Sequence, residues 1–332
     1  MKIAIVKLSA MGDIIHAMIA VQFIKQAKPE IQIDWIVEQG FAQVLAHNPH
    51  IDNILALNLK AIKKNKMALF TEVKKINTYA KNNYDLVIDA QGLLKSAITS
   101  KLLGKKVIGF SKASIREGVS SYFYDEKIAI AYEKNAIERN IKVLCEPLAI
   151  SVSKEQILNK EAFLYFKTSQ NLLMEIDTIK NYLLLVVGAS VKNKIYPKEK
   201  FLKVVQNINE KVFVIWANDY EKEVAEYLAR KANNVIACPK LNLDELKHVI
   251  AKSKLVIGGD TGPTHMAWAL NVPSITLFGN TPEYRNTYIT PINQVLKSKT
   301  KVNPLKLDKN DFSIQEIDPN SIIELAKELL NA

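Results

Sequence analysis

Short apolar runs alternate with longer amphipathic stretches along most of this chain. In the first half, runs typical of buried strands occupy residues 2–6, 31–37, 53–57, 85–89 and 106–110. Helical spacing of apolar residues fills the intervals, for example over residues 17–28 and 69–82. Strands that alternate with helices predict a parallel sheet covered by helices on both faces.

The second half repeats this alternation. Its expected strands are residues 182–187, 212–216, 235–238, 254–257 and 274–278. A helix that begins at Leu243 is marked by apolar residues on one face and by Asn242 and Glu245, which are spaced as a helix-capping pair. We therefore predict an α/β protein with two Rossmann-like, doubly wound domains.

The domain boundary is less marked, because no segment rich in Gly, Pro or Ser separates the halves. We place the N-terminal domain at residues 1–170 and the C-terminal domain at residues 171–315. Residues 316–332 contain a last helix, which we expect to pack back on the N-terminal domain.

The composition agrees with two domains of ordinary size. The chain has 332 residues, of which 48% are apolar, and this is enough for two separate cores. Lys and Arg exceed Asp and Glu by 45 to 34, so we expect attraction to phosphorylated sugars, nucleic acid or an anionic membrane surface. Cys145 and Cys238 have no metal-binding spacing and indicate buried thiols in a reducing compartment. No apolar run reaches the roughly 20 residues that span a bilayer, so we expect a soluble or peripheral protein.

Two strand-to-helix turns carry an acidic residue next to glycine. Gly12-Asp13 follows the first strand, and Gly258-Gly259-Asp260-Thr261-Gly262 follows the strand at residues 254–257. Such turns lie at the carboxyl edge of a parallel sheet, where open α/β domains bind their ligands. The pair predicts two sheets that face each other across a cleft, as in an enzyme that holds one substrate on each domain.

Asp13 has two interpretations. Asp is among the residues that best cap the N–H groups at a helix start, and the spacing alone favours this structural role. Alternatively, a carboxylate at the sheet edge accepts a proton from a substrate hydroxyl as a general base. Ser9 and His16 flank Asp13 and are either further site residues or ordinary polar residues.

The turn at residues 258–265 fits an anion site. Its glycines allow a ligand close to the backbone, and the following helix starts with unpaired N–H groups that favour negative charge. Thr261, Gly262 and Thr264 are the candidates for phosphate contact. Asp260 would repel a diphosphate, so we expect it to fix the turn or to accept hydrogen bonds from sugar hydroxyls. The alternative is a tight turn that binds no ligand.

Polar residues follow two other strands of the second half. Ser190 and Lys194 come after the strand at residues 182–187 and fit a phosphate cradle at the same sheet edge, although a solvated loop would look similar. Asp219 follows the strand at residues 212–216, where a carboxylate binds ribose hydroxyls or caps a helix.

Basic residues of the first half are candidates to bind an anionic substrate, or they are ordinary surface residues. They are Lys63, Lys64, Lys66, Lys95, Arg116 and Arg139. The sequence lacks Gly-x-Gly-x-x-Gly, Gly-Lys-Ser/Thr and Asp-x-Asp motifs. A nucleotide-sugar diphosphate would therefore be neutralised by positive side chains and helix-end amides.

Six motifs together resemble one known family. Residues 7–17, Lys-Leu-Ser-Ala-Met-Gly-Asp-Ile-Ile-His-Ala, are similar to the N-terminal motif of the bacterial lipopolysaccharide heptosyltransferases of glycosyltransferase family 9. The other motifs follow in the order of that family, at residues 88–96, 114–117, 137–140, 194–197 and 259–265. The first motif most resembles that of the members that add the first heptose.

This resemblance implies a GT-B fold, with the acceptor on the N-terminal domain and ADP-heptose on the C-terminal domain. It implies an inverting transfer of L-glycero-D-manno-heptose, without a metal or another cofactor, to a Kdo residue of Kdo-lipid A in inner-core synthesis. Asp13 is then the general base. The implied donor contacts are Ser190, Lys194, Asp219, Asp260, Thr261, Gly262, Thr264 and His265. The implied acceptor contacts are Ser9, Gly12, Lys63, Lys64, Lys66, Arg116 and Arg139.

The basic cluster at residues 63–66 departs from the family pattern. It contains lysine where relatives are rich in arginine, and lysine cannot grip a carboxylate with two parallel hydrogen bonds. Because lipid A is held in a membrane, we expect a cytoplasmic monomer that visits the cytoplasmic face of the inner membrane. Its positive surface and the apolar residues 67–70 would draw it there, and we expect no nucleic-acid partner.

Three other functions remain open. Another family 9 transferase would prefer an acceptor that already carries heptose. A non-catalytic protein that binds anionic glycolipid or nucleic acid would be unaffected by Asp13→Asn. A two-domain nucleotide-sugar epimerase would turn over its donor without any acceptor.

Overall fold

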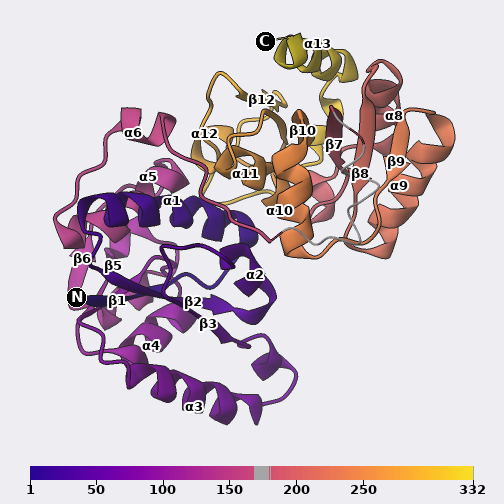
Figure 1. Cartoon of the computed structure of the whole chain (residues 1–332). Helices are drawn as coiled ribbons and strands as arrows, with labels where there is room; N and C mark the ends of the chain where they lie inside the picture. Colours follow the sequence, from indigo (N-terminus) through magenta and orange to yellow (C-terminus); the bar gives the residue numbers. More distant parts are fainter. Residues whose placement is uncertain (168–178, 180, 332) are drawn as a thin grey trace. The chain divides into compact units, whose positions relative to one another are not determined.

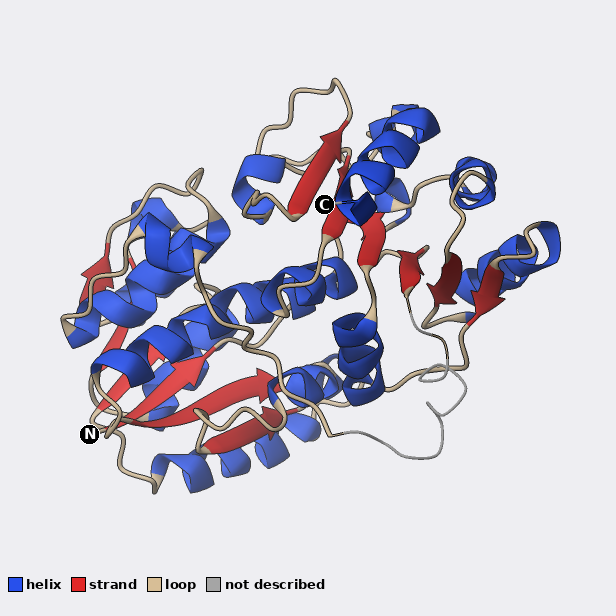
Figure 2. Ribbon diagram, turned by 45° about the horizontal axis from the view of Figure 1, so that its top comes forward, coloured by secondary structure: helices blue, strands red, loops and turns tan. Residues whose placement is uncertain are grey.

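The computed structural model describes residues 1–167, 179 and 181–331. The chain divides into two compact units, Met1–Phe163 and Leu164–Ala332 (Figure 1). The boundary expected after residue 170 lies outside the described residues. Each unit is a sheet of parallel strands between layers of helices (Figure 2).

The first unit has a six-stranded parallel sheet in the order β3-β2-β1-β4-β5-β6. Its strands are β1 (Lys2–Val6), β2 (Gln32–Glu38), β3 (Asn53–Leu57), β4 (Leu86–Asp89), β5 (Val107–Phe110) and β6 (Glu126–Ile128). One face is covered by α1 (Met11–Ala27) and α5 (Ala136–Cys145), and the other by α3 (Ala68–Ala80) and α4 (Leu94–Leu103) (Figure 1). The central strands are buried on both sides, as their continuous apolar runs predict.

The second unit repeats this architecture in the order β12-β11-β10-β7-β8-β9. Its strands are β7 (Tyr182–Val186), β8 (Lys211–Ile215), β9 (Val235–Ala237), β10 (Leu255–Gly259), β11 (Ser274–Phe278) and β12 (Asn293–Lys297). The helices on one face are α8 (Lys198–Gln206), α9 (Asp219–Lys231) and α13 (Pro319–Asn331). The other face carries α10 (Leu243–Lys252) and α11 (Gly262–Ala269), which pack on each other. The predicted α/β fold with two doubly wound sheets is confirmed.

Shorter helices connect these elements. They are α2 (Ala42–Leu45), α6 (Lys154–Leu158), α12 (Glu283–Asn286) and the 3-10 helices η1 (Gln39–Phe41), η2 (Ala61–Lys63), η3 (Lys112–Ser114), η4 (Gly118–Phe123), η5 (Glu146–Leu148), η6 (Lys192–Lys194) and η7 (Ser313–Glu316). Among the described residues, no helix is long and apolar enough to cross a membrane. Both cysteines are buried free thiols, as the sequence predicted, and burial raises the pKa of each to about 12.

The last helix corrects one prediction. The sequence assigned it to the N-terminal domain, but Ile322, Ile323 and Ala326 of α13 lie in the core of the second unit. They pack with apolar residues of α8, β10 and β11. An amphipathic terminal helix shows which of its faces is apolar but not which sheet that face will cover, so the sequence could not decide between the two units.

The first helix also starts earlier than the sequence suggested. Gly12 and Asp13 belong to the first turn of α1, whereas the sequence placed them in a turn before a helix at residues 17–28. Side chains of α1 are buried without interruption from Ile14 to Ile24. A helix that is apolar on nearly all sides gives no clear periodic pattern, which explains the late predicted start.

Candidate active site

Both sheets reverse their strand order between two central strands. In the first sheet β1 lies between β2 and β4, and in the second sheet β10 lies between β11 and β7. The register pairs Val6 with Asp89, and Val186 with Gly258, so in each sheet two loops leave the carboxyl edge side by side. Such a switch point is where open α/β sheets bind ligands. Of the sequence-predicted residues, Asp13 follows β1, Ser190 and Lys194 follow β7, and residues 260–265 follow β10.

Asp13 is the third residue of α1 and is exposed to solvent. Its Oδ2 accepts a hydrogen bond of 3.2 Å from the backbone N–H of Ala10. The carboxylate therefore folds back on the residue that precedes the helix, as the acidic residue of a capping box does. This explains the structural role that the spacing indicated, and it leaves the carboxylate accessible at the switch point for a proton-accepting role.

Gln91 binds the backbone segment that precedes Asp13 in the sequence. Its Oε1 accepts hydrogen bonds of 3.0 Å from the N–H groups of both Leu8 and Ser9. Gly92, which follows it, has a φ of +71°, and a Cβ there would lie 2.6 Å from Cγ2 of Ile115. Gln91 had no predicted role. Its position directly after β4, at the same sheet edge as Asp13, could have indicated a role in the site.

Asp89, the last residue of β4, fixes the loop that contains Gln91 and Gly92. It is fully buried and accepts hydrogen bonds from the N–H groups of Gln91 and Gly92 and from the hydroxyls of Ser96 and Tyr124. Burial raises the pKa of Asp89, although these four donors act in the opposite direction. A buried carboxylate with four donors fixes the path of the chain after β4, and through Gln91 it supports the loop before Asp13.

In the second unit, Asp260 is the centre of a buried polar cluster. Its Oδ2 accepts from Lys194 Nζ at 2.7 Å, from Thr281 Oγ1 at 2.8 Å and from Asn286 Nδ2 at 3.2 Å. Its Oδ1 lies 3.0 Å from Nε2 of His265. Thr281 and Asn286 were missed by sequence reasoning, although Thr281 follows β11 at the same sheet edge.

The charge of Asp260 is stable in this cluster. Burial alone would raise the pKa of Asp260, but Lys194 and His265 hold it well below its usual value. Because its folded pKa is lower than its unfolded pKa, the carboxylate stabilises the fold at neutral pH, and this contribution decreases as the pH falls below the unfolded pKa. The structure thus brings Lys194 and Asp260 together, as their strand-end positions indicated.

Two close approaches shape this site. A Cβ on Gly259 would lie 2.9 Å from the carbonyl oxygen of Lys194, so the glycine lets the loop after β7 cross the end of β10. Thr264 Oγ1 donates to the carbonyl oxygens of Gly259 and Thr261. The hydroxyl of Thr264 is therefore used inside the turn, where it also accepts from the N–H of Thr261 at 3.3 Å. The partly exposed Gly262 is better placed to present its N–H group to an anion.

Other predicted donor residues differ in their surroundings. Ser190 and Asp219 are exposed at the carboxyl ends of β7 and β8. Glu221, which had no predicted role, is buried at this edge, and a Cβ on Gly188 would lie 2.1 Å from its carboxylate. Glu221 also receives hydrogen bonds from the N–H of Ala217 and the side chain of Asn218. The capping spacing between Asn218 and Glu221 was its signal in the sequence.

Arg139, which the resemblance implied as an acceptor contact, binds backbone groups inside the first unit. Its guanidinium is buried and donates to the carbonyl oxygens of Ile130 (3.1 Å), Ala131 (2.7 Å) and Ser114 (2.6 Å). It also lies over the rings of Phe110 and Tyr132. This arginine connects the loop after β6 to the segment after β5. From the sequence, a charged residue on an amphipathic helix was expected at the surface.

The remaining basic candidates are placed differently. Arg116, Lys64 and Lys66 are exposed in loops after β3 and β5, so an anionic ligand can reach them. The side chain of Lys63 lies outside the part of the structure that is described.

Replacing Arg139 by Met should therefore lower stability. The change leaves three backbone carbonyl groups without their charged donor, and we expect a loss of about 2–4 kcal/mol in the free energy of unfolding. Arg116→Met is the matched control, because Arg116 is exposed and its removal should change stability by less than about 0.5 kcal/mol. Thermal unfolding of both variants tests this, and equal midpoints would contradict the structural role of Arg139.

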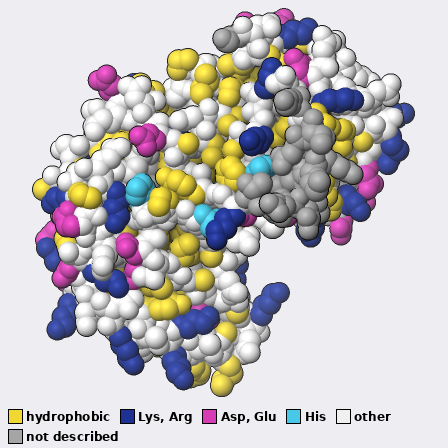
Figure 3. Space-filling view, viewed as in Figure 1, with side chains coloured by type: hydrophobic (Ala, Val, Ile, Leu, Met, Phe, Trp, Pro, Cys, Tyr) yellow, Lys and Arg dark blue, Asp and Glu magenta, His cyan; other side chains and the backbone are white. Residues whose placement is uncertain are grey.

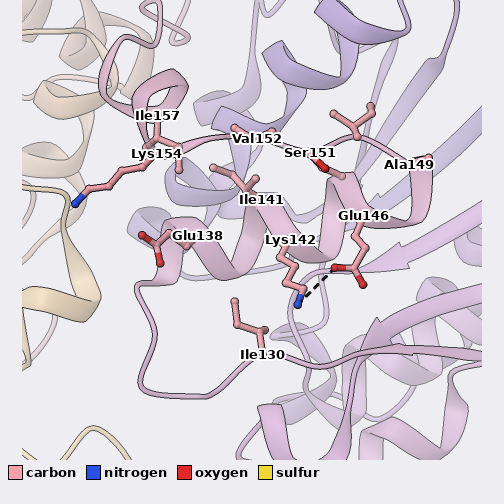
Figure 4. A pocket seen from close by; sticks show the side chains of 12 residues that line it. Ile130, Glu138, Ile141, Lys142, Glu146, Ala149, Ser151, Val152, Lys154 and Ile157 are labelled. Carbon is pink, nitrogen blue, oxygen red and sulfur yellow. Dashed lines mark ion pairs between the residues drawn. The ribbon is translucent and has the colours of Figure 1, made fainter.

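A separate pocket of about 630 Å³ lies along α5 in the first unit. Figure 4 shows its lining, including the ion pair of 3.5 Å between Lys142 and Glu146. Residues 149–152 and α6 border it, and none of the predicted site residues contributes to it. It is therefore distinct from the candidate site at the sheet edge.

Comparisons with known proteins agree with this geometry. The family model described as glycosyltransferase family 9 (heptosyltransferase) matches residues 74–311. Lipopolysaccharide heptosyltransferase 1 of Campylobacter coli is 40% identical over 344 residues, which cover 99% of each chain. Lipopolysaccharide heptosyltransferase 1 of Escherichia coli K12 is 31% identical and covers 85% of this chain and 88% of its own.

Solved structures give the same result for the fold. E. coli heptosyltransferase WaaC with ADP-2-deoxy-2-fluoro heptose superposes over 100% of both chains, with a TM-score of 0.81 and 26% identity. E. coli ADP-heptose lps heptosyltransferase II, at 16% identity, shares the fold with a TM-score of 0.74. With two doubly wound units of the GT-B type and a family match over most of its length, the chain belongs to glycosyltransferase family 9 and is a glycosyltransferase.

Proposed function

We propose that this enzyme transfers L-glycero-D-manno-heptose from ADP-heptose to a Kdo residue of Kdo-lipid A, in the synthesis of the lipopolysaccharide inner core. The names of its relatives support heptose as the transferred sugar, and the WaaC complex with an ADP-heptose analogue supports the donor. The observation that carries the proposal is the ion pair between the partly exposed Lys194 and the buried Asp260, beside the start of α11. It offers a fixed ammonium and helix-end N–H groups to a diphosphate at the switch point of the second sheet.

The donor site is built on the second unit. Lys194 and Ser190 would bind the diphosphate together with the N–H groups near Thr261 and Gly262. Asp260 accepts hydrogen bonds from Lys194, Thr281 and Asn286 and contacts His265, which fills the usual capacity of a carboxylate. We therefore assign Asp260 first to the orientation of Lys194, and a contact with a heptose hydroxyl would replace one of these partners. Ribose hydroxyls would be bound by Glu221 or Asp219 at the end of β8.

The acceptor site is built on the first unit. Asp13 would take the proton of the acceptor hydroxyl while its oxygen attacks the anomeric carbon. The new glycosidic C–O bond forms as the bond from that carbon to the ADP oxygen breaks, and the configuration inverts in this single displacement. Negative charge grows on the leaving diphosphate, where Lys194 and the helix-end amides would stabilise it without a metal ion. Ser9, Gly12, Lys64, Lys66 and Arg116 are the remaining candidates to hold the anionic acceptor.

One assay tests the proposal directly. The purified protein is incubated with ADP-heptose and Kdo-lipid A in the presence of EDTA, and the product is identified by mass spectrometry and by the NMR signal of its anomeric carbon. We expect one added heptose with inverted configuration. Transfer only to an acceptor that already carries heptose would assign the enzyme to a later step. Release of ADP or conversion of the donor without an acceptor would contradict the proposal.

Gln91→Met should lower kcat by roughly 10- to 100-fold, because a misplaced catalytic group costs about this much. The variant removes the acceptor of the Leu8 and Ser9 N–H groups, which fix the backbone before Asp13. Gln91→Glu keeps an oxygen at this position and should recover most of kcat. Steady-state kinetics with both variants measure this, with KM for ADP-heptose as an internal control that should stay unchanged. A Met variant with normal kcat would show that Gln91 does not position Asp13.

The acceptor of the proposed reaction is a lipid, so the protein would work at the cytoplasmic face of the inner membrane as a peripheral enzyme. The net charge of +11 supports attraction to an anionic membrane surface.

A further inference from the structure

Helix α4 of the first unit exposes a line of apolar side chains. Leu94, Ile98 and Leu102 are spaced by four residues, so they lie on one side of the helix, and each is 40–43% exposed. Lys95 and Lys101 are exposed beside them. A helix on the surface of a globular domain normally turns its apolar stripe inward, and α4 does so with Ala97 and Leu103. The outer line is therefore a second apolar stripe, which stays partly exposed to solvent.

Neighbouring elements extend this stripe on both sides. η4 packs against α4 and exposes Val119 (60%) and Tyr122 (71%). α3 packs against the other side of α4, and its start exposes Met67 (67%) and Phe70 (69%), with Leu69 between them. We call the exposed surface of α3, α4 and η4, together with residues 64–67 before α3, the docking face.

The charge of the docking face has one sign. Exposed lysines lie among its apolar residues, namely Lys64, Lys66, Lys74, Lys95 and Lys101, and Lys81 and Lys112 are exposed at its border. The one acidic residue within α3, α4 and η4 is Glu72, which is buried and bonded to Lys75 and to the N–H of Asn58. At the border, Glu117 accepts from the N–H of Leu94 and Asp125 pairs with Lys101. In Figure 3, Lys and Arg side chains gather along the lower rim of the first unit, over α3.

The helices of the docking face start at the edge of the sheet where Asp13 lies. α3 and α4 each follow a strand of the parallel sheet, so both helices start at its carboxyl edge, as α1 does. Met67, Phe70 and Leu94 therefore lie toward the edge of the sheet where Asp13 lies. A lipid acceptor held in a bilayer under this face would present its sugar toward the same edge.

We propose that the docking face binds the surface of an anionic lipid bilayer, with its apolar side chains inserted among the headgroups and its lysines paired with lipid phosphates. The inference rests on the proposed function in one respect, namely that the acceptor is membrane-bound. Apolar residues intermixed with lysines, without an exposed carboxylate on the three elements, match an extended anionic surface with an apolar interior. A protein partner would more usually meet an apolar centre from which charged residues are depleted.

Binding to vesicles tests the proposal without donor or acceptor. The full-length protein is sedimented with vesicles of phosphatidylethanolamine and phosphatidylglycerol, and with vesicles of phosphatidylcholine alone. We expect binding to the anionic vesicles that weakens with salt. Ile98→Glu/Leu102→Glu should weaken it at least tenfold, and Lys74→Gln roughly fivefold, which corresponds to one lysine near an anionic surface.

Leu158→Glu is the matched control, because Leu158 of α6 is 43% exposed in the same unit, as Ile98 is, but lies outside the docking face. Circular dichroism should show that all variants fold, since every changed side chain is exposed. The control should bind vesicles like the wild type. Equal binding by the double variant, or an equal loss in Leu158→Glu, would overturn the proposal. Self-association that depends on Ile98 and Leu102, without vesicle binding, would overturn it in favour of a protein contact.

A second readout separates this proposal from the proposed function. The double variant should transfer heptose normally to an acceptor without acyl chains, and at least tenfold more slowly to Kdo-lipid A embedded in anionic vesicles. Equal rates on the embedded acceptor would overturn the docking face. A wild type that transfers heptose to neither acceptor would contradict the proposed function, while the sedimentation experiment would still decide on the docking face.

Discussion

Asp13→Asn is expected to lower kcat for heptose transfer by about 10²–10⁴-fold, which is the usual contribution of a positioned general base. The Asn side chain has nearly the same size, and its amide oxygen can still accept the hydrogen bond that Ala10 donates to Asp13. It cannot take up the proton that the acceptor hydroxyl loses when its oxygen attacks. The loss should therefore appear in kcat with ADP-heptose and Kdo-lipid A at saturation, whereas the fold stays intact.

Two controls make this result specific. The affinity of the Asn variant for ADP, measured by calorimetry, should equal that of the wild type, because Asp13 belongs to the first unit and the proposed donor site to the second. Asp13→Glu keeps a carboxylate but displaces it by one methylene, so it should retain more activity than Asn. A kcat that stays within a few-fold of the wild type in Asp13→Asn would show that another group accepts the proton.

Most of the fold could be predicted because buried parallel strands are short, apolar and bounded by polar residues. Three predicted strands, Lys2–Val6, Asn53–Leu57 and Ser274–Phe278, have the observed bounds. The edge strands β6 (Glu126–Ile128) and β12 (Asn293–Lys297) were missed. Edge strands have neighbours on one side only and tolerate polar residues, so their sequences do not show a continuous apolar run.

The candidate site was predictable where it depends on strand ends. A parallel sheet brings the residues after its central strands to one edge, and this places Lys194 beside Asp260 although the two are far apart in the sequence. Contacts of single side chains could not be predicted in this way. Arg139 looked like a surface cation, yet it is buried because three carbonyl groups from two different loops converge on it. Such convergence depends on tertiary packing, which a residue's neighbours in sequence do not encode.

Lys194→Met is expected to lower kcat by about 10²–10³-fold, the size of effect seen when one fixed donor to a developing negative charge is removed. The Met side chain has a similar length and apolar stem, but it provides no charge for the leaving diphosphate. Asp260 keeps its contacts with Thr281, Asn286 and His265, so the buried carboxylate stays partly satisfied. We expect a loss of about 1–3 kcal/mol in stability from the broken ion pair. Steady-state kinetics and thermal unfolding measure the two effects separately.

Asp260→Asn distinguishes a catalytic role of Lys194 from a purely structural one. Both variants break the same ion pair of 2.7 Å, and both should therefore lower the unfolding temperature. Only Lys194→Met also removes the ammonium, so its kcat should fall well below that of Asp260→Asn, in which the positive charge remains at the sheet edge. Lys194→Arg keeps a positive charge with a different shape and should lie between the two. If Lys194→Met lost stability but kept kcat, the ion pair would be a structural support of the turn, and the charge of the leaving diphosphate would have to be stabilised by Ser190 and the amides of α11.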